Sequence, residues 1–304
     1  MASVAVIGAG AVGGVVAARL MQSSANAVTV AARSPVESLQ ISYGDSSIHV
    51  SPRVLLEHSE GSPQDWVLVT TKAYDAAGAA EWFPTMVGPH STVAILQNGV
   101  EHRERFAPYL PPHQILPVVV DLAAERVAPG VVTQKGRAEL TVPRSPVARG
   151  FTALFEGTGI SVVEVDDFVT AAWRKLCLNV TGAVSALALT ADIPGNDRDV
   201  ADLVGGVVGE AMRVGNAVGA SLDAALVDEI VRRFQARTPQ GVNSMLADRL
   251  AGRPMEIDAR NGAVVRIGAA RGIATPINRT LVGLLRAVPP HSPSADDTLS
   301  GPRH

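Results

Sequence analysis

The sequence predicts an α/β protein: a doubly wound, mostly parallel sheet at the N-terminus, followed by an all-helical C-terminal domain. Up to about residue 167, short β-branched apolar runs alternate with helical stretches, as expected of strands buried on both faces. A glycine-rich turn joins the first of these runs to the first helical stretch. After residue 167 the apolar residues recur with helical spacing.

The 304 residues are enough for two domains, since a domain takes roughly 100–200 residues. We expect a first domain over residues 1–166 and a helical second domain over residues 167–288. Residues 289–304 are rich in Pro, Ser and Asp and show no periodicity, so we expect a flexible tail there.

The individual elements follow from these patterns. In the first domain the β-branched runs predict strands at 3–7, 27–33, 65–72, 91–99, 114–120, 130–136 and 160–167. In the second, the 3.6-residue spacing predicts helices within 166–189, 197–220, 222–237, 243–253, 255–272 and 276–288.

Charge and composition exclude several classes of protein. The formal net charge is -3 and no block of Lys and Arg occurs, which argues against a nucleic-acid partner. The N-terminus has no basic region before its glycines, so neither a signal peptide nor a membrane segment is predicted. Cys177 is the only cysteine, which rules out an intrachain disulfide and a Cys-rich metal site and favours a cytoplasmic location. We expect no metal.

The remaining partners are small molecules and other copies of the chain. The stretch "VADLVGGVVGEAM" is rich in small apolar residues. Such a helix suits close packing in a homodimer, or equally the interior of the domain.

The first strand is followed by the pattern G-x-G-x-x-G, formed by Gly8, Gly10 and Gly13. Gly8 permits a tight turn, Gly10 lets the backbone approach a pyrophosphate, and Gly13 lets helix and strand pack closely. A glycine-rich turn can be only a turn, but its position between a strand and a helix indicates a Rossmann dinucleotide-binding domain. The predicted cofactor-binding turn comprises Gly8, Ala9, Gly10, Ala11, Val12 and Gly13.

The end of the second strand indicates which dinucleotide is bound. NAD-preferring sites place an acidic residue there to bind the ribose hydroxyls, whereas this chain has Arg33 followed by Ser34. A cation and a hydroxyl suit the 2′-phosphate of NADP, and we expect no carboxylate nearby to repel it. The alternative is an exposed arginine at a strand end; we predict NADP(H).

Lysine is rare in this chain. The 26 basic residues are 23 arginines and three lysines, namely Lys72, Lys135 and Lys175. A lysine can release its proton when its surroundings lower its pKa, whereas an arginine effectively never does. Lys175 is therefore a candidate proton donor, although a lone lysine is more often a solvated surface residue.

A reductase needs a group that protonates the alkoxide formed at the carbonyl, and no histidine occurs between residues 114 and 290. Asn179 follows Lys175 by four residues, so both lie on one helix face. Ser244 and Glu256 offer a hydroxyl and a carboxylate, although Glu256 could equally stabilise the first turn of a helix. Trp173 and Cys177 are interpreted as packing residues.

Several stretches together carry a resemblance to a known family: "VAVIGAGAVGG", "TKAYD", "LQNGVE", "WRKLCLNV" and residues 238–278. In this order they resemble the ketopantoate reductase (2-dehydropantoate 2-reductase) family over almost the whole chain except the tail. The resemblance implies reduction of 2-dehydropantoate to (R)-pantoate with NADPH by a Rossmann domain and a helical domain.

The resemblance also implies roles for individual residues. Lys175 would be the general acid, and Glu256 would hold the substrate hydroxyl and the lysine. Asn98, Asn179 and Ser244 would bind substrate. The cofactor would be bound by the glycine turn, Lys72, Asn98 and Glu256, with Arg33 on its 2′-phosphate.

The chain departs from the family pattern at one place. Members commonly have Asn followed by Pro four residues after the first Asn of the lysine helix, where this chain has Ala183 and Val184. On a helix, Lys175, Asn179 and Ala183 form one stripe, so a polar substrate contact is missing there. Reduction of another 2-oxo acid is therefore an alternative. A non-catalytic NADP(H)-binding sensor is disfavoured because Lys175, Asn179 and Glu256 are all retained.

Overall fold

The computed structural model describes residues 1–194, 197–236 and 241–288. Its contacts divide the chain into two compact units, Met1–Ala171 and Ala172 to the C-terminus, and each unit is described by itself. The expected tail, 289–304, lies outside the described residues. The expected domain limits of 1–166 and 167–288 stay predictions.

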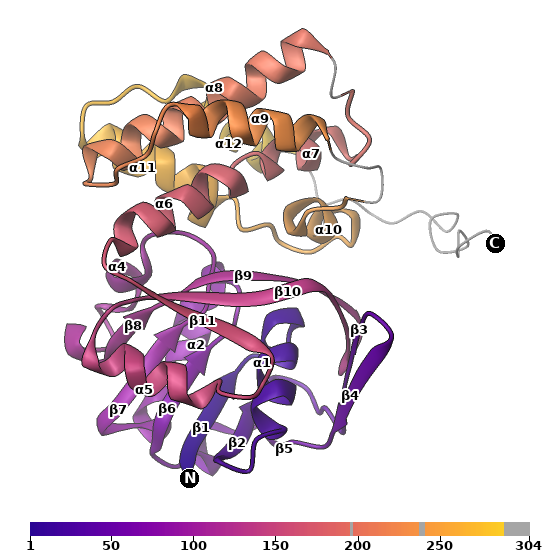
Figure 1. Ribbon diagram of the computed structural model, residues 1–304, viewed down its shortest axis with the longest axis vertical. Coiled ribbons are helices and arrows are strands. Elements are labelled where there is room, and N and C mark those ends of the chain that lie inside the picture. The colour runs from indigo at the N-terminus through magenta and orange to yellow at the C-terminus, as the bar shows by residue number, and fades with distance from the viewer. Residues whose placement is uncertain (195–196, 237–240, 289–304) are drawn as a thin grey trace, which may run out of the picture. The chain divides into compact units, whose positions relative to one another are not determined.

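The first unit is built on a six-stranded parallel sheet (Figure 1). Its strand order is β5-β2-β1-β6-β7-β8. In chain order these strands are β1 (Ala2–Ile7), β2 (Asn26–Ala31), β5 (Arg53–Leu55), β6 (Gln64–Val69), β7 (Val87–Ile95) and β8 (Ile115–Pro117). The order reverses direction between β1 and β6, which is the point where Rossmann sheets bind dinucleotides. The predicted fold class is thus confirmed, and among the strands of this sheet only the three-residue β5 was missed.

The central strand β1 is buried on both faces, with alternate residues in two different cores. Val4 and Val6 pack in one core with α1 (Ala11–Met21) and with strands of a second sheet. Ala5 and Ile7 pack in the other core. That core also contains residues of α2 (Ala76–Ala80), α3 (Phe83–Met86) and α4 (His102–Phe106).

A second, five-stranded sheet was not predicted. It is ordered β11-β10-β3-β4, with β9 pairing antiparallel to β10. Its strands are β3 (Leu39–Tyr43), β4 (Ser46–Val50), β9 (Val119–Ala128), β10 (Val131–Pro143) and β11 (Ile160–Val165), and α5 (Pro146–Leu154) joins the last two. Buried and less buried residues alternate along much of β10, which is typical of a strand covered on one face.

The predicted run 114–120 is divided between the two sheets. Pro117 ends β8 in the parallel sheet, and Val119 begins β9 in the second sheet. The hairpin of β3 and β4 was missed because its strands are short and largely polar; Gly44 turns it with a φ of 53°.

The described part of the second unit is helical and contains no strand. Helix α6 (Phe168–Asn179) crosses the boundary between the units. It is followed by α7 (Gly182–Ala188), α8 (Arg198–Ala217), α9 (Ala225–Gln235), α10 (Ser244–Leu250), the π-helix η4 (Asp258–Gly262), α11 (Ala263–Ala270) and α12 (Pro276–Ala287). In the described chain, no helix combines the length and apolar character needed to cross a membrane.

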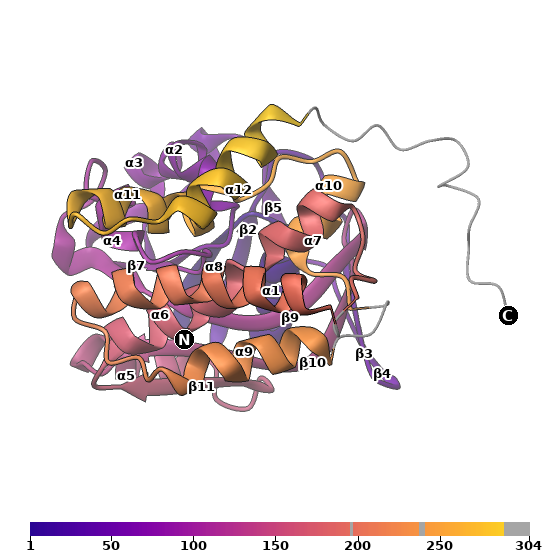
Figure 2. The same ribbon diagram turned by 90° about the horizontal axis from the view of Figure 1, so that it is seen from above.

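Helix α8 lies beside α9 in this unit (Figure 2), and its glycines pack against neighbouring side chains. A Cβ on Gly206 would lie 2.4 Å from Ile277 Cδ1, and one on Gly215 would lie 2.9 Å from the Trp173 ring. Of the two alternatives for this helix, packing in the interior of the domain is therefore the one that the structure shows. A homodimer stays a prediction and draws no support from α8.

The helix expected over residues 166–189 is interrupted. Helix α6 ends at Asn179 and α7 begins at Gly182. The Val180 carbonyl at the break accepts hydrogen bonds from the Ala183 amide at 3.3 Å and from Asn261 Nδ2 at 3.1 Å. The prediction that Lys175, Asn179 and Ala183 form one stripe on a continuous helix is therefore wrong. The helix is interrupted where the side-chain amide of Asn261 donates to the Val180 carbonyl.

Candidate dinucleotide and substrate site

The glycine turn lies at the carboxyl end of β1. Gly8 has a φ of 104°, a conformation that favours glycine. A Cβ on Gly13 would lie 1.8 Å from the Gly8 carbonyl oxygen, so only glycine lets α1 approach the turn. A Cβ on Gly10, in contrast, would meet no atom within 4 Å. The absence of that Cβ leaves an open approach to the backbone.

The N-terminus of α1 faces this approach with backbone N–H groups. Gly10 is the N-cap residue, no side chain caps the helix, and its first turn contains no acidic residue. The first N–H groups of a helix have no partner within the helix and attract anions. The turn therefore fits the pyrophosphate of a dinucleotide.

Beyond β1 in the sheet order, strands β6 and β7 bring two predicted residues to this edge. Lys72 follows β6 by three residues and Asn98 follows β7 by three residues, and both are half-buried. Gln97 Nε2 donates to Thr71 Oγ1 at 3.0 Å and to the Lys72 carbonyl at 3.3 Å. The segments that carry Lys72 and Asn98 are thus tied together. Sequence reasoning missed Gln97, although it stands beside Asn98 in the "LQNG" motif.

His102 supports the same segment from the first turn of α4. Its Nε2 lies 2.8 Å from the Gln97 carbonyl, and because a carbonyl only accepts, Nε2 carries the proton. Burial is the main cause that lowers the pKa of His102 to about 4. The ring is therefore neutral near pH 7 and acts as a hydrogen-bond donor.

Arg33 lies two residues beyond β2, where it was predicted to bind a 2′-phosphate. Its side chain is 89% exposed, and its Nη1 lies 3.5 Å from Asp75 Oδ2. The expectation that no carboxylate lies nearby is wrong. Asp75 is 42 residues away in the chain, but β2 and β6 both flank β1, which brings their carboxyl ends to the same edge.

In the second unit, α6 presents Lys175 and Asn179 one turn apart, and both are half-buried. Trp173 and Cys177 are buried, which confirms their interpretation as packing residues. Burial raises the pKa of the Cys177 thiol to about 12, so this cysteine is unreactive.

Ser244 and Glu256, the other two predicted residues of this unit, both contact Arg260. Arg260 Nη2 donates to Ser244 Oγ at 2.8 Å and lies 3.6 Å from Glu256 Oε2. Ser244 is exposed at the start of α10, whereas Glu256 and Arg260 are buried. Sequence reasoning missed Arg260, although its i,i+4 spacing from Glu256 could have indicated the pair.

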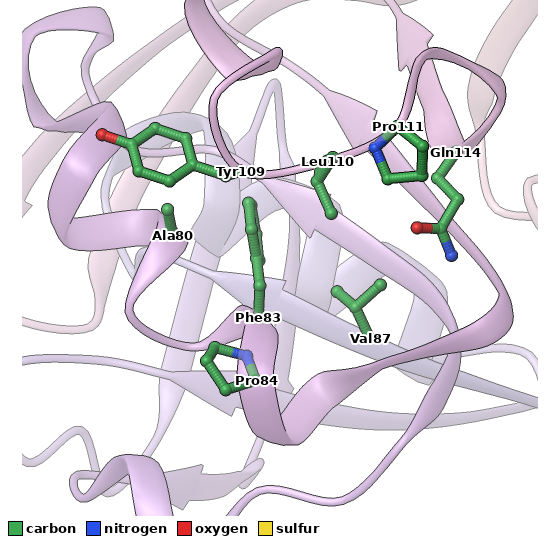
Figure 3. A pocket seen from close by; sticks show the side chains of 8 residues that line it. All are labelled: Ala80, Phe83, Pro84, Val87, Tyr109, Leu110, Pro111 and Gln114. Carbon is green, nitrogen blue, oxygen red and sulfur yellow. The ribbon is translucent and has the colours of Figure 1, made fainter.

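A surface hollow of 320 Å³ is separate from these residues (Figure 3). It is lined by Ala80, Phe83, Pro84, Val87, Tyr109, Leu110, Pro111 and Gln114. Val87 begins β7 and Gln114 directly precedes β8, so the hollow lies at the amino ends of the parallel strands. The glycine turn lies at their carboxyl ends.

The parallel sheet, with a glycine turn at its reversal point, and the helical second unit define a dinucleotide-binding protein of the Rossmann class. The family model described as ketopantoate reductase PanE/ApbA matches residues 4–146, and the model of its C-terminal part matches residues 167–289. The chain belongs to the ketopantoate reductase PanE/ApbA family.

Individual relatives agree with this assignment. A 2-dehydropantoate 2-reductase of Caulobacter vibrioides is 46% identical, over 94% of this chain and 99% of that protein. One of Mycobacterium tuberculosis is 36% identical, over 93% and 97%. The crystal structure of a PanE/ApbA family ketopantoate reductase from Ralstonia eutropha is 29% identical with a TM-score of 0.85, over 93% and 97%. As a member of this family, the protein is an oxidoreductase that acts on a small molecule with a nicotinamide cofactor.

Proposed function

We propose that this protein reduces 2-dehydropantoate (ketopantoate) to (R)-pantoate with NADPH. The observation that carries the proposal is the likeness to the Caulobacter vibrioides 2-dehydropantoate 2-reductase, which is 46% identical and matches over nearly the full length of both chains. The glycine turn at the reversal point of the sheet supports the same reaction, because it offers a place for the dinucleotide.

The preference for NADPH rests on Arg33. Its exposed guanidinium stands at the end of β2, where the ribose carrying the 2′-phosphate of NADP is held in Rossmann sheets. The Asp75 side chain is 25% exposed, but its partner Arg33 stands in solvent, and ion pairs screened by solvent contribute little, roughly 0–1 kcal/mol. A phosphate, which accepts two hydrogen bonds from a guanidinium, would displace the carboxylate.

The residues divide the chemistry between them. When bound, NADPH would supply the hydride for the carbonyl carbon. The Lys175 ammonium donates a proton to the carbonyl oxygen, and Glu256 accepts a hydrogen bond from a hydroxyl of the substrate and holds the lysine. Asn98, Asn179 and Ser244 orient the substrate. Lys72, Asn98 and the glycine turn would hold the cofactor at the edge of the sheet, and Glu256 is a further predicted cofactor-binding residue.

A second candidate reaction is reduction of a different 2-oxo acid. Ala183 and Val184 are both apolar and buried, so the polar contact that the family pattern implies at the Asn position is absent. A substrate without the hydroxyl of ketopantoate would lose nothing at these positions.

Following the absorbance of the reduced nicotinamide tests the proposal directly. NADPH and NADH are each mixed with ketopantoate and with a panel of other 2-oxo acids. We expect the highest kcat/KM with NADPH and ketopantoate. A higher value for another 2-oxo acid would select the second reaction, and no oxidation with any member of the panel would contradict both.

We also propose a homodimer in the cytoplasm. The lone Cys177 is free and buried, which suits a reducing compartment. Light scattering on the purified protein should give twice the chain mass of 31.6 kDa; a value equal to the chain mass would reject the dimer.

A further inference from the structure

Arg260 is a buried cation between two residues of the proposed substrate site. Its side chain is 4% exposed and that of Glu256 is 3% exposed. The same nitrogen, Nη2, donates to Ser244 Oγ at 2.8 Å and faces Glu256 Oε2 at 3.6 Å. Among the described residues, the buried Nε of Arg260 has no hydrogen-bond acceptor. Burial of a guanidinium that is not fully satisfied is costly, which indicates a role beyond packing.

The chemistry of the guanidinium determines how Ser244 is used. Arginine has only donors, so Ser244 Oγ must act as the acceptor in this hydrogen bond. The hydroxyl proton of Ser244 then points away from Arg260. Because Ser244 is exposed, this proton is available to a ligand, and the ligand atom that receives it must be a hydrogen-bond acceptor, such as an oxygen of a carboxylate or carbonyl.

The backbone around Arg260 is arranged to hold it in place. Residues Asp258–Gly262 form a π-helix, in which the Gly262 amide donates to the Ile257 carbonyl at 2.9 Å. Such distortions are frequent at functional sites. A Cβ on Gly182, the first residue of α7, would lie 3.0 Å from Asn243 Oδ1 and 3.6 Å from Arg260 Nη1. The start of α7 therefore lies against the guanidinium.

We propose that Arg260 is a positioning residue of the substrate site. It holds the Ser244 hydroxyl through a hydrogen bond, so that the hydroxyl proton is directed to an acceptor of the 2-oxo acid, and it holds the Glu256 carboxylate through the ion pair. The inference rests on the proposed function, since it assigns Ser244 and Glu256 to substrate binding.

A double-mutant cycle on KM tests the inference. The variants are Arg260→Gln, Ser244→Ala and the double variant, assayed with saturating NADPH and varied 2-oxo acid. We expect each single change to raise KM for the acid about tenfold, the worth of one lost hydrogen bond, with a smaller effect on kcat. The double variant should be little worse than either single variant, because both changes remove the same interaction.

Arg249→Gln is the matched control. Arg249 is also a buried arginine of this unit, and its Nη1 donates to the Ala186 carbonyl at 2.7 Å. Its replacement should lower the melting temperature, and any effect on KM should multiply with that of Ser244→Ala. The inference would be overturned if the increases in KM caused by Arg260→Gln and Ser244→Ala multiplied in the double variant. An unchanged KM in Ser244→Ala would overturn it as well.

Arg260→Lys covers the case in which the glutamine variant does not fold. A lysine keeps the charge but lacks the planar fork, so it reaches Ser244 or Glu256 but not both. We expect a raised KM with a melting temperature near that of the wild type; a wild-type KM would contradict the inference. Failure of the proposed function is a separate result, since the wild-type protein would then oxidise no NADPH with any 2-oxo acid tested.

Discussion

Among single residues, the three lysines are the most informative, because the chain otherwise uses arginine as its basic residue. Lys135 forms an exposed ion pair with Glu125 at 2.8 Å, an ordinary surface role. Lys72 and Lys175 are half-buried, and both belong to the segments proposed to form the site. Only Lys175 is proposed to release a proton, which arginine could not do.

The first prediction concerns this proton. Lys175→Met removes the donor while keeping an unbranched apolar stem, and we expect kcat to fall by about 10²- to 10⁴-fold, the usual contribution of a general acid. NADPH binding, followed by fluorescence, should change little. Lys135→Met is the control and should keep full activity. An active Lys175→Met enzyme would exclude the proposed acid.

Arg33 and Asp75 allow a second prediction, on cofactor choice. Arg33→Ala should raise KM for NADPH about tenfold and leave KM for NADH unchanged, because only NADPH carries the 2′-phosphate. Asp75→Asn removes the competing carboxylate and should lower KM for NADPH two- to threefold, in line with a weak exposed pair. The exposed Arg53 provides the control, as Arg53→Ala. Equal effects of Arg33→Ala on both cofactors would argue against the phosphate contact.

At the scale of elements, the turn between β1 and α1 uses its glycines for different reasons. Gly13 is needed for packing, because its Cβ would collide with the Gly8 carbonyl. A Cβ on Gly10 would contact no atom of the protein, so the fold itself does not require glycine there. Glycine is required only to make room for a bound ligand.

This difference gives the third prediction. Gly10→Ala should fold with an unchanged melting temperature but bind NADPH more than tenfold more weakly, because the new methyl group occupies the approach to the pyrophosphate. Gly13→Ala should lower the melting temperature markedly. Calorimetric melting together with a cofactor titration separates the two outcomes. Unimpaired NADPH binding by Gly10→Ala would place the pyrophosphate elsewhere.

Another feature at this scale is the break between α6 and α7. Asn261 Nδ2 donates to the Val180 carbonyl at 3.1 Å and to Asn278 Oδ1 at 2.9 Å. Asn278 Nδ2 in turn donates to Glu210 Oε2 at 2.8 Å. This buried chain of side chains holds the C-terminal end of the helix that carries Lys175 and Asn179.

For the whole molecule, His102 predicts how the stability depends on pH. The pKa of the buried ring is about 4 in the folded protein, below its ordinary value of about 6.5. Between these values the unfolded chain binds more protons, so stability is lost as the pH falls from about 6.5 to about 4, by about 3 kcal/mol in total.

The fourth prediction follows from this linkage. His102→Gln keeps a donor for the Gln97 carbonyl but does not titrate, so its free energy of unfolding should fall less than that of the wild type over this range. Urea unfolding at a series of pH values measures the effect, with His49→Gln, at an exposed position on β4, as the control. Parallel curves for the wild type and His102→Gln would show that burial of His102 is not the cause.

Much of the fold could be predicted because its signals are local. The glycine turn, the buried strands and the 3.6-residue periodicity each reflect the backbone and burial demands of consecutive residues. The same holds for Lys175 and Asn179, since four residues on a helix bring two side chains to one face. The resemblance to the ketopantoate reductase family, which covers almost the whole chain except the tail, is confirmed. It could be recognised in the sequence because each of its motifs is a continuous stretch of the chain.

Long-range pairing decided the rest. The second sheet joins β3 to β10, strands about 90 residues apart, and the interrupted helix after Asn179 depends on an amide from Asn261. Arg33 meets Asp75, and Ser244 meets Arg260, only because folding brings distant segments together. Such contacts depend on burial and on the satisfaction of polar groups in three dimensions, which a linear pattern of residue types does not contain.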